Sequence, residues 1–237
     1  MTSSKQTPSL PTTSAELPNG AELLLDTLMA CGVDTVFGYP GGAALPLYDA
    51  LYQRPALRHV LVRHEQAAVH AAEGYARSTG RVGVVLVTSG PGVSNTITGL
   101  LDAHSDAIPV LCISGQVATG VIGTQAFQES DALGMSRPVT KWNCQLHDAA
   151  QTVSAVRNAL RVAASGKPGP VLLDVPKDVQ LQRPRRQVEL SVPESGPAPS
   201  ALPQPGLLQQ AAHRHAGVQR HPAGQRRADD REQQRGE

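Results

Sequence analysis

The chain has 237 residues, 40% of them hydrophobic, and a formal net charge of +1. This length allows one large domain, or one domain with a tail, and the near-neutral charge gives no whole-chain sign of binding to nucleic acid or to a membrane surface. The sequence has no segment long and apolar enough for a transmembrane helix, and its polar N-terminus lacks the apolar core of a signal peptide. The three cysteines are far apart and lack metal-ligand spacing, so we expect reduced thiols in a cytoplasmic protein.

In chain order, predicted helices and short strands alternate. The first helix has apolar residues at helical spacing, Asn19 as its N-cap and Gly32 as its stop. The run "VGVVLVTS" is continuously apolar, which is typical of a strand buried on both faces. Helices are predicted over 20–32, 43–52, 65–79, 92–105 and 147–165, and strands over 34–40, 58–63, 82–89, 109–115 and 169–176. This alternation predicts an α/β fold, a parallel β-sheet with helices on both faces.

Composition divides the chain into three parts. Residues 1–19 are predicted to be a disordered lead, 20–182 the α/β domain, and 183–237 a proline-rich linker with a low-complexity tail. No aromatic residue follows Trp142, and the tail has few large apolar residues, so we expect the tail to be disordered. The tail is basic, but acids interrupt its basic residues and no aromatic ring is present to stack on a base. Nucleic acid is therefore not a predicted partner.

Four unusual short motifs each follow a predicted strand. They are "GYPGG" after the first strand, "RHEQ" after the second, "TSGPGVSN" after the third and "SGQ" after the fourth. Right-handed crossovers bring the carboxyl ends of parallel strands to one edge of the sheet, where ligands bind in such folds. Glycine turns needed only for structure would explain one or two of these motifs, but less easily all four. The sequence therefore predicts a ligand site at this edge.

The segment "TSGPGVSN" has two interpretations. Gly90 and Gly92 let the backbone approach a ligand closely, Pro91 stiffens the turn, and the helix that follows offers unpaired N–H groups. However, the segment lacks the lysine of a P-loop and the third glycine of a dinucleotide fingerprint. A structural turn between strand and helix accounts for it equally well.

Glu65 lies where a predicted strand runs into a helix. A carboxylate in the first helical turn gains about 0.3–1 kcal/mol from the helix dipole, which explains it without any function. The alternative is an acid held at the mouth of the ligand site. We expect His64 to be a polar neighbour and His70 to be a packed histidine. The sequence shows no catalytic triad and no metal-ligand spacing, so no metal-binding residue is predicted.

Seven motifs that occur in order carry a resemblance to a known family. They are "GYPGGAALPLYDAL", "HEQAAVHAAEGYAR", "GVVLVTSGPGVSN", "GQV", "IGTQAFQESD", "TKWN" and "GKPGPVLLDVPKDVQ". Together they closely resemble the N-terminal, pyrimidine-binding domain of the acetolactate synthase (acetohydroxyacid synthase) large subunit, a thiamine-diphosphate enzyme of branched-chain amino-acid biosynthesis. The resemblance covers about Gly20 to Gln180. Glyoxylate carboligase and 2-oxo-acid decarboxylases are weaker alternatives, and the former lacks the glutamate that Glu65 supplies.

The resemblance implies a role for Glu65 and a reaction. In this family the matching glutamate binds N1′ of the cofactor's aminopyrimidine and so helps the cofactor to lose its C2 proton. Pyruvate is then decarboxylated and joined to a second 2-oxo acid. Pyruvate as acceptor gives 2-acetolactate, and 2-oxobutyrate gives 2-aceto-2-hydroxybutyrate. The cofactor carries the chemistry, while the protein orients it and places the proton.

The resemblance also implies roles for single residues. Pro91 and Asn95 match a segment that lies against the pyrimidine, and Gly41 and Gly42 match a cofactor-binding turn beside the reacting carbons. Matches near the substrate are Phe127 and Gln128, the latter also a predicted catalytic residue, and Lys167 stands where the family commonly has an arginine that contacts FAD. Two further departures are Gln125, usually aspartate, and Ala118, usually proline.

Family members are more than twice as long, with a middle FAD-binding domain and a C-terminal domain that holds the diphosphate and Mg²⁺ through a "GDG" motif. This chain has no "GDG". We therefore expect a truncated synthase, inactive alone, whose tail arose by reading-frame slippage. A homo-oligomer, dimer or tetramer, and a small regulatory subunit are the implied partners. The alternative is a standalone pyrimidine-binding subunit or regulatory partner of a split thiamine-diphosphate enzyme.

Overall fold

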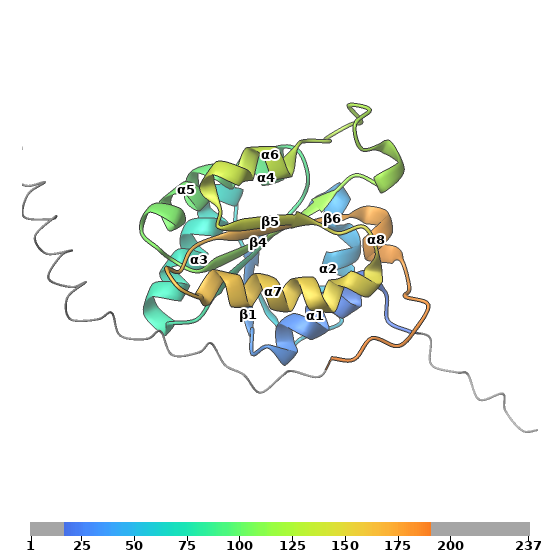
Figure 1. Ribbon diagram of the computed structural model, residues 1–237, viewed down its shortest axis with the longest axis horizontal. Coiled ribbons are helices and arrows are strands. Elements are labelled where there is room, and N and C mark those ends of the chain that lie inside the picture. Colours follow the sequence, from blue (N-terminus) through green and yellow to red (C-terminus); the bar gives the residue numbers. More distant parts are fainter. Residues whose placement is uncertain (1–16, 191–237) are drawn as a thin grey trace, which may run out of the picture. The chain divides into compact units, whose positions relative to one another are not determined.

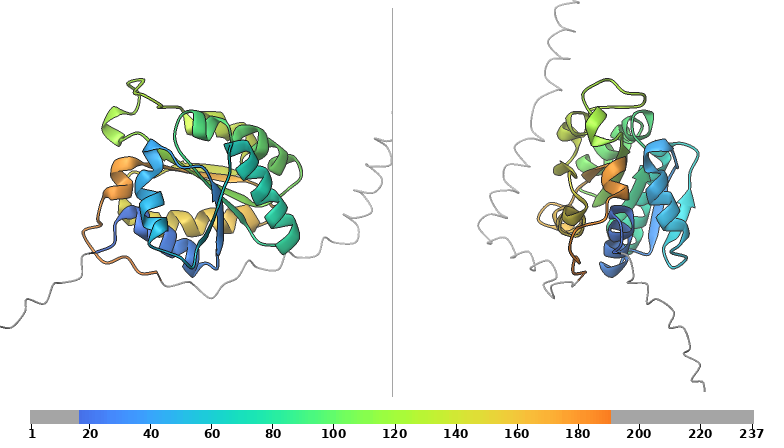
Figure 2. Two further views of the ribbon diagram at one scale, coloured as in Figure 1. Left: turned by 180° about the vertical axis from the view of Figure 1, so that it is seen from behind. Right: turned by 90° about the vertical axis from the view of Figure 1, so that its right-hand side faces the viewer.

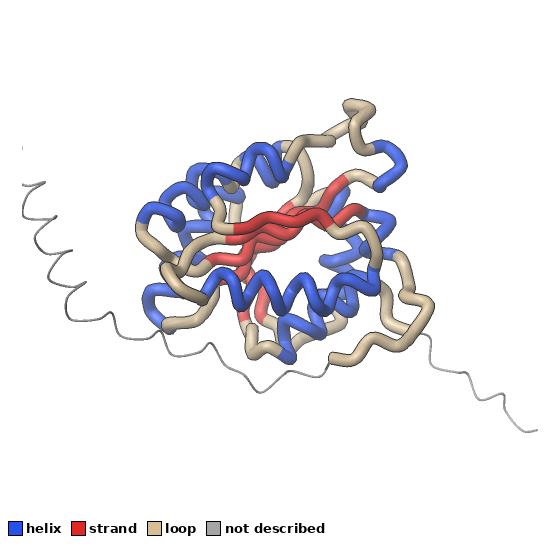
Figure 3. The backbone as a smooth tube through the Cα atoms, in the orientation of Figure 1, coloured by secondary structure: helices blue, strands red, loops and turns tan. Residues whose placement is uncertain are grey.

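The computed structural model describes residues 17–190, and these residues form one six-stranded parallel sheet with helices on both faces (Figures 1 and 2). The strand order is β2-β1-β3-β4-β6-β5, and every neighbouring pair is parallel. The strands are β1 (Thr35–Gly38), β2 (Arg58–Leu61), β3 (Gly83–Val87), β4 (Val110–Gln116), β5 (Trp142–Gln145) and β6 (Val171–Pro176). In Figure 3 the strands lie side by side, with helices above and below them. The predicted fold class is confirmed.

Two apolar cores lie on opposite faces of the sheet. One core joins the sheet to α1 (Gly20–Ala30), α2 (Leu45–Tyr52), α7 (Thr152–Ala164) and α8 (Lys177–Leu181). The other joins it to α3 (Glu65–Thr79), α4 (Pro91–Ser94), α5 (Ile97–Ser105) and α6 (Ala132–Ser136). Successive side chains of a strand point to opposite faces, so Leu111 and Ile113 enter the first core and Val110 and Cys112 the second. This double burial explains the continuous apolar runs of the central strands.

The first helix begins where the sequence predicts. Asn19 Oδ1 accepts a hydrogen bond from the Glu22 backbone N–H at 2.9 Å, and Glu22 Oε2 accepts one from the Asn19 N–H at 2.7 Å. This reciprocal capping box satisfies two N–H groups that the helix itself leaves unpaired. Gly32, with φ +83°, follows the end of the helix.

Replacing Asn19 with alanine is expected to lower the free energy of unfolding by about 1 kcal/mol, because the side-chain acceptor for the Glu22 N–H is lost, while the backbone N–H of residue 19 can still donate to Glu22. Urea unfolding followed by circular dichroism measures the change. Asn19→Ser is the matched control, since a serine oxygen still caps the helix, and it should cost only a few tenths of a kcal/mol. Equal losses in the two variants would mean that the cap contributes nothing measurable.

Three features differ from the sequence-based expectation. The helix predicted over 92–105 is two helices, α4 and α5, with Asn95 and Thr96 between them. Strand β5, "WNCQ", was not predicted, because its half-buried residues show no apolar alternation. The short helices α6 and α8 were also missed. The other predicted elements are present, with α2 and α7 each preceded by one turn of 3₁₀ helix.

The predicted N-terminal lead, apart from residues 17–19, and the tail from 191 onward lie outside the described residues. The predicted limits of the domain therefore stay predictions, although the first helix begins at Gly20 and the last ends at Leu181. Over residues 17–190, no helix is long and apolar enough to cross a membrane.

Candidate functional site at the carboxyl edge of the sheet

Glu65 and Asn95 meet at the carboxyl edge of the sheet. Glu65 is the first residue of α3, which His64 caps by accepting the Gln66 N–H at 3.2 Å through Nδ1. Its side chain is buried, with 7% exposure, and its Oε2 accepts a hydrogen bond from Asn95 Nδ2 at 2.9 Å. Burying a carboxylate is costly without hydrogen bonds, and the amide of Asn95 provides one. Two residues singled out 30 positions apart are therefore direct partners.

Two glycine turns pack around Thr88, the residue that follows β3. A Cβ atom on Gly41 would lie 2.5 Å from Thr88 Cγ2, and one on Gly92 would lie 2.7 Å from the same atom. The Gly92 Cβ would also stand 3.6 Å from Glu65 Oε1. Thr88 in turn accepts the Ala43 N–H at 3.1 Å through Oγ1. The turns after β1 and β3 are thus held together, and glycine keeps the space beside the Glu65 carboxylate free of side chains.

A cavity of about 290 Å³ opens beside these turns. Three residues predicted from the sequence, Gly42, Phe127 and Gln128, line it. Phe127 is 88% exposed, and Gln128 has φ +59°, a value that residues other than glycine rarely adopt. The remaining lining residues are Ala43, Ser89, Val117, Ala118 and Lys177. The cavity combines apolar surface with an amide and an ammonium group, which suits a small anionic organic molecule.

The loop over residues 117–130 docks on the Gly90 turn. The Gly90 N–H donates to Ser130 Oγ at 3.2 Å, and a Cβ atom on Gly90 would lie 2.7 Å from the Gln128 carbonyl oxygen. Inside the loop, the Glu129 carboxylate accepts the backbone N–H groups of Gly123 and, at 3.0 Å, Ala126. The Gly123 N–H is the main reason that the pKa of Glu129 is lowered. The loop is therefore folded on itself and attached to the turn through its last residues.

Tyr48, on α2, is hydrogen-bonded to β3. Its hydroxyl donates to the Leu86 carbonyl oxygen at 2.8 Å. Burial raises the pKa of Tyr48 above its ordinary value, and the negative charge of Glu65 raises it further. Tyr48 therefore stays neutral and serves as a hydrogen-bond donor near the site. The sequence did not single it out, because it lies in the middle of an amphipathic helix.

The predicted site residues do not all come together. Glu65, Asn95, Gly41, Gly42 and the pair Phe127 and Gln128 gather at the carboxyl edge, as does Pro91, the exposed first residue of α4. Lys167 does not. It is exposed in the loop that leads from α7 into β6, at the opposite edge of the sheet.

Lys177 is a cavity residue that the sequence analysis missed. It directly follows β6 and begins α8. The strand-end rule that drew attention to the other motifs would have found it, since β6 was correctly predicted.

The expectation for His70 was wrong. This histidine is exposed on α3 rather than packed, and its Nδ1 pairs with Glu73 Oε2 at 2.7 Å and lies 3.7 Å from Asp102 Oδ2 on α5. Burial raises the pKa of Glu73, while the hydrogen bond from His70 lowers it. The candidate ligand atoms of His70, Glu73 and Asp102 lie within 4.8 Å of one another. Sequence spacing did not reveal this cluster, because it joins two helices.

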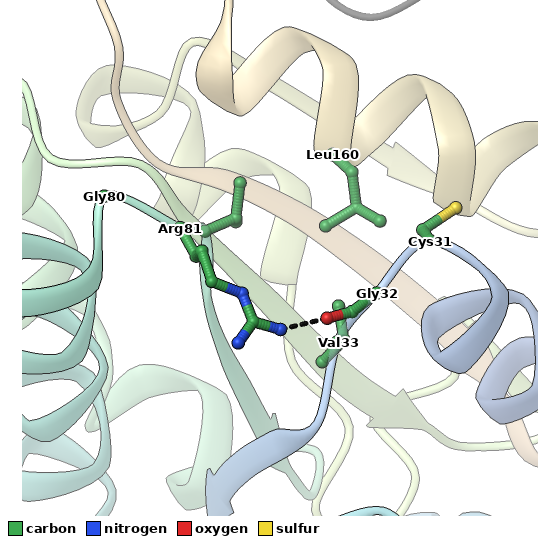
Figure 4. A pocket seen from close by; sticks show the side chains of 7 residues that line it. Cys31, Gly32, Val33, Gly80, Arg81 and Leu160 are labelled. Carbon is green, nitrogen blue, oxygen red and sulfur yellow. Dashed lines mark hydrogen bonds between the residues drawn. The ribbon is translucent and has the colours of Figure 1, made fainter. Parts of the chain in front are cut away.

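A separate cavity of about 230 Å³ lies at the amino edge of the sheet, where β1 and β3 begin (Figure 4). Arg81 spans it, donating to the Gly32 carbonyl oxygen and pairing with Asp34 at 2.6 Å. Hydrogen bonds from Arg81, then Thr35 and Tyr75, lower the pKa of Asp34 to about 2. Because these polar groups are already paired with each other, this cavity is a weaker candidate site than the carboxyl edge.

Comparison with known proteins agrees with the geometry. Residues 18–135 match the family model described as "Thiamine pyrophosphate enzyme, N-terminal TPP binding domain". The chain is 54% identical over 160 residues to the acetolactate synthase large subunit of Haemophilus influenzae. The aligned segment covers 68% of this chain and 28% of the relative. It is 54% identical over 164 residues to the isozyme 3 large subunit of Escherichia coli, covering 69% and 29%. A probable acetolactate synthase large subunit of Methanococcus aeolicus is 49% identical over 184 residues, covering 78% and 29%. The chain thus spans less than a third of the length of these relatives.

Proposed function

Because residues 18–135 belong to the thiamine pyrophosphate enzyme family, we propose that this chain provides the pyrimidine-binding part of an acetolactate synthase active site. The observation that carries the proposal is the buried Glu65 carboxylate. Its Oε2 accepts a hydrogen bond from Asn95, and its Oε1 lies next to Gly92. A flat aminopyrimidine fits this arrangement. One of its ring nitrogens needs a group that accepts or shares a proton, and a flat ring fits into a narrow space.

Each group at the edge has a definite task in this proposal. Glu65 holds a proton at the ring nitrogen N1′, and Asn95 fixes the carboxylate that does so. Gly92 keeps a side chain away from the Glu65 carboxylate, and Gly41 lets its turn pack closely on Thr88. Thiamine diphosphate, when bound, supplies the chemistry that decarboxylates a 2-oxo acid.

The cavity lined by Phe127, Gln128 and Lys177 is the proposed place for the substrates. Pyruvate is the donor, and a second pyruvate or 2-oxobutyrate is the acceptor. Lys177 offers a positive charge to the carboxylate of the 2-oxo acid, and Phe127 offers apolar surface to its methyl group.

The rest of the enzyme has to come from sequence beyond this domain, since the chain covers 28–29% of the relatives. We propose that the diphosphate, Mg²⁺ and most of FAD are held there, with Lys167 as a point of contact for FAD at the opposite edge. A homo-oligomer, a regulatory subunit and a cytoplasmic location belong to the same proposal. The second candidate is a standalone pyrimidine-binding subunit that completes its site with a separate chain.

A chimeric synthase tests the function. Residues 20–181 of this chain replace the matching N-terminal segment of the Haemophilus influenzae large subunit. We expect acetolactate to form from pyruvate, with dependence on added thiamine diphosphate. The two candidates are separated by mixing the 237-residue chain with the remainder of that subunit as a separate chain. Activity of the mixture favours a standalone subunit, activity of the fused chain alone favours a domain of one synthase, and no activity in either form contradicts both.

A further inference from the structure

A buried carboxylate that no predicted role uses lies in the same sheet. Asp174 is in β6 and has no exposed surface. Its Oδ1 accepts the Ser114 hydroxyl at 2.7 Å, and its Oδ2 accepts the side-chain amides of Gln145 at 2.7 Å and Gln116 at 3.1 Å. These donors come from β4 and β5, the two strands that flank β6. Burial raises the pKa of Asp174 on balance, and the three hydrogen bonds oppose this rise. Donors reach both carboxylate oxygens, so both oxygens act as acceptors here.

Gln116 connects this carboxylate to the 117–130 loop. The amide nitrogen that donates to Asp174 also donates to the Ser130 carbonyl oxygen at 2.9 Å, and the amide oxygen accepts the Val117 N–H at 3.0 Å. The Gln116 side chain therefore attaches the last residue of the loop to the end of β4, while its bond to Val117 is local, between adjacent residues. Asp174 fixes the orientation of that amide, because only an acceptor at its position leaves the nitrogen pointing at both partners.

A cavity of about 290 Å³ borders the network, lined by Gln116, Gln145 and Asp174 and by loop residues that include Glu129 and Ser130. Gln116 and Asp174 are themselves buried, so water competes little for the hydrogen bonds that attach the end of the loop. Further attachments are Ser130 to Gly90 and, near the loop's start, the Thr119 N–H to Asp178 at 3.0 Å.

We propose that Asp174 is a positioning residue, which acts through Gln116 to hold the 117–130 loop, and with it Phe127 and Gln128, against the Gly90 turn. The proposal rests on the proposed function in one respect: that function identifies the loop as part of the substrate-binding side of the site. Asp174 itself does not line the cavity proposed for the substrates.

Hydrogen exchange of the 237-residue chain, followed by mass spectrometry, tests the attachment without any ligand. Asp174→Leu has a similar volume but no acceptor for the Gln116 amide, so peptides covering 117–130 should exchange about tenfold faster. Peptides of α1 and β3 should be unchanged. Asp34→Leu is the matched control, because Asp34 also accepts from three side chains but at the opposite edge. If Asp174→Leu fails to fold, Gln116→Met, which removes the hydrogen bond to Ser130, should give the same local acceleration.

The chimeric synthase separates positioning from a general structural role. Asp174→Leu should raise KM for pyruvate about tenfold and leave KM for thiamine diphosphate within twofold, because Glu65 and Asn95 are untouched. The proposal is overturned if loop exchange in a folded variant is unchanged, or if the two KM values rise together. If the parent chimera is inactive, the proposed function fails while the exchange experiment still decides whether Asp174 holds the loop.

Discussion

Replacing Glu65 with glutamine in the chimeric synthase is expected to lower the rate of acetolactate formation by about 10²–10⁴-fold, the usual contribution of a positioned acid or base. Glutamine has nearly the same shape and keeps an oxygen that can accept from Asn95, so the local structure should survive. It cannot hold a proton at the ring nitrogen as a carboxylate does. The loss should therefore appear in turnover and persist at saturating thiamine diphosphate.

Glu73→Gln is the matched control for this variant. Glu73 lies on the same helix, is 3% exposed and pairs with His70 rather than with the site. We expect its activity to stay within about threefold of the parent, and thermal unfolding of both variants checks that they are folded. Similar activities in Glu65→Gln and Glu73→Gln would remove the central role given to Glu65.

Replacing Gly90 with alanine is expected to have the second largest effect. Gly90 has φ +59° and ψ −117°, and its Cβ atom would lie 2.7 Å from the backbone oxygen of Gln128. The added methyl group has to push the loop away from the turn. We expect a loss of about 1–3 kcal/mol in the free energy of unfolding. Displacing Gln128 by about 1 Å should lower activity about 100-fold.

Gly120→Ala tests whether the effect is specific to that contact. Gly120 lies in the same loop, a methyl group added there would meet no atom of the described residues within 4 Å, and its φ is not positive. Urea unfolding and the acetolactate assay should both show it close to the parent chain. If Gly90→Ala behaves like Gly120→Ala, the loop does not depend on close approach to the turn.

Much of the fold was accessible from sequence because local and long-range signals agree. Helix α3 runs over the predicted 65–79, since a polar cap precedes it and Gly80, in a left-handed conformation, ends it. Strand β3 is buried on both faces, so its apolar run is unambiguous. Strand β5 was missed for the opposite reason. Within the described residues it pairs with β6 alone, at the end of the sheet, and it is half-buried with the polar sequence "WNCQ".

The site was predicted only in outline. The strand-end rule places Glu65 and Asn95 at one edge, but their hydrogen bond depends on how the turns after β2 and β3 converge, which no local pattern encodes. Asp174 shows the same limit. A single acid in "VLLDVP" carries no sign that Ser114, Gln116 and Gln145 will surround it, because that neighbourhood exists only once β4, β5 and β6 are adjacent.

The most direct test of the central claim is a crystal structure of the chimeric synthase with thiamine diphosphate bound. We predict that a carboxylate oxygen of Glu65 lies at hydrogen-bonding distance, about 2.6–3.2 Å, from N1′ of the aminopyrimidine. A structure in which Glu65 stays bonded to Asn95 alone, while another group contacts N1′, would contradict the role proposed for this residue.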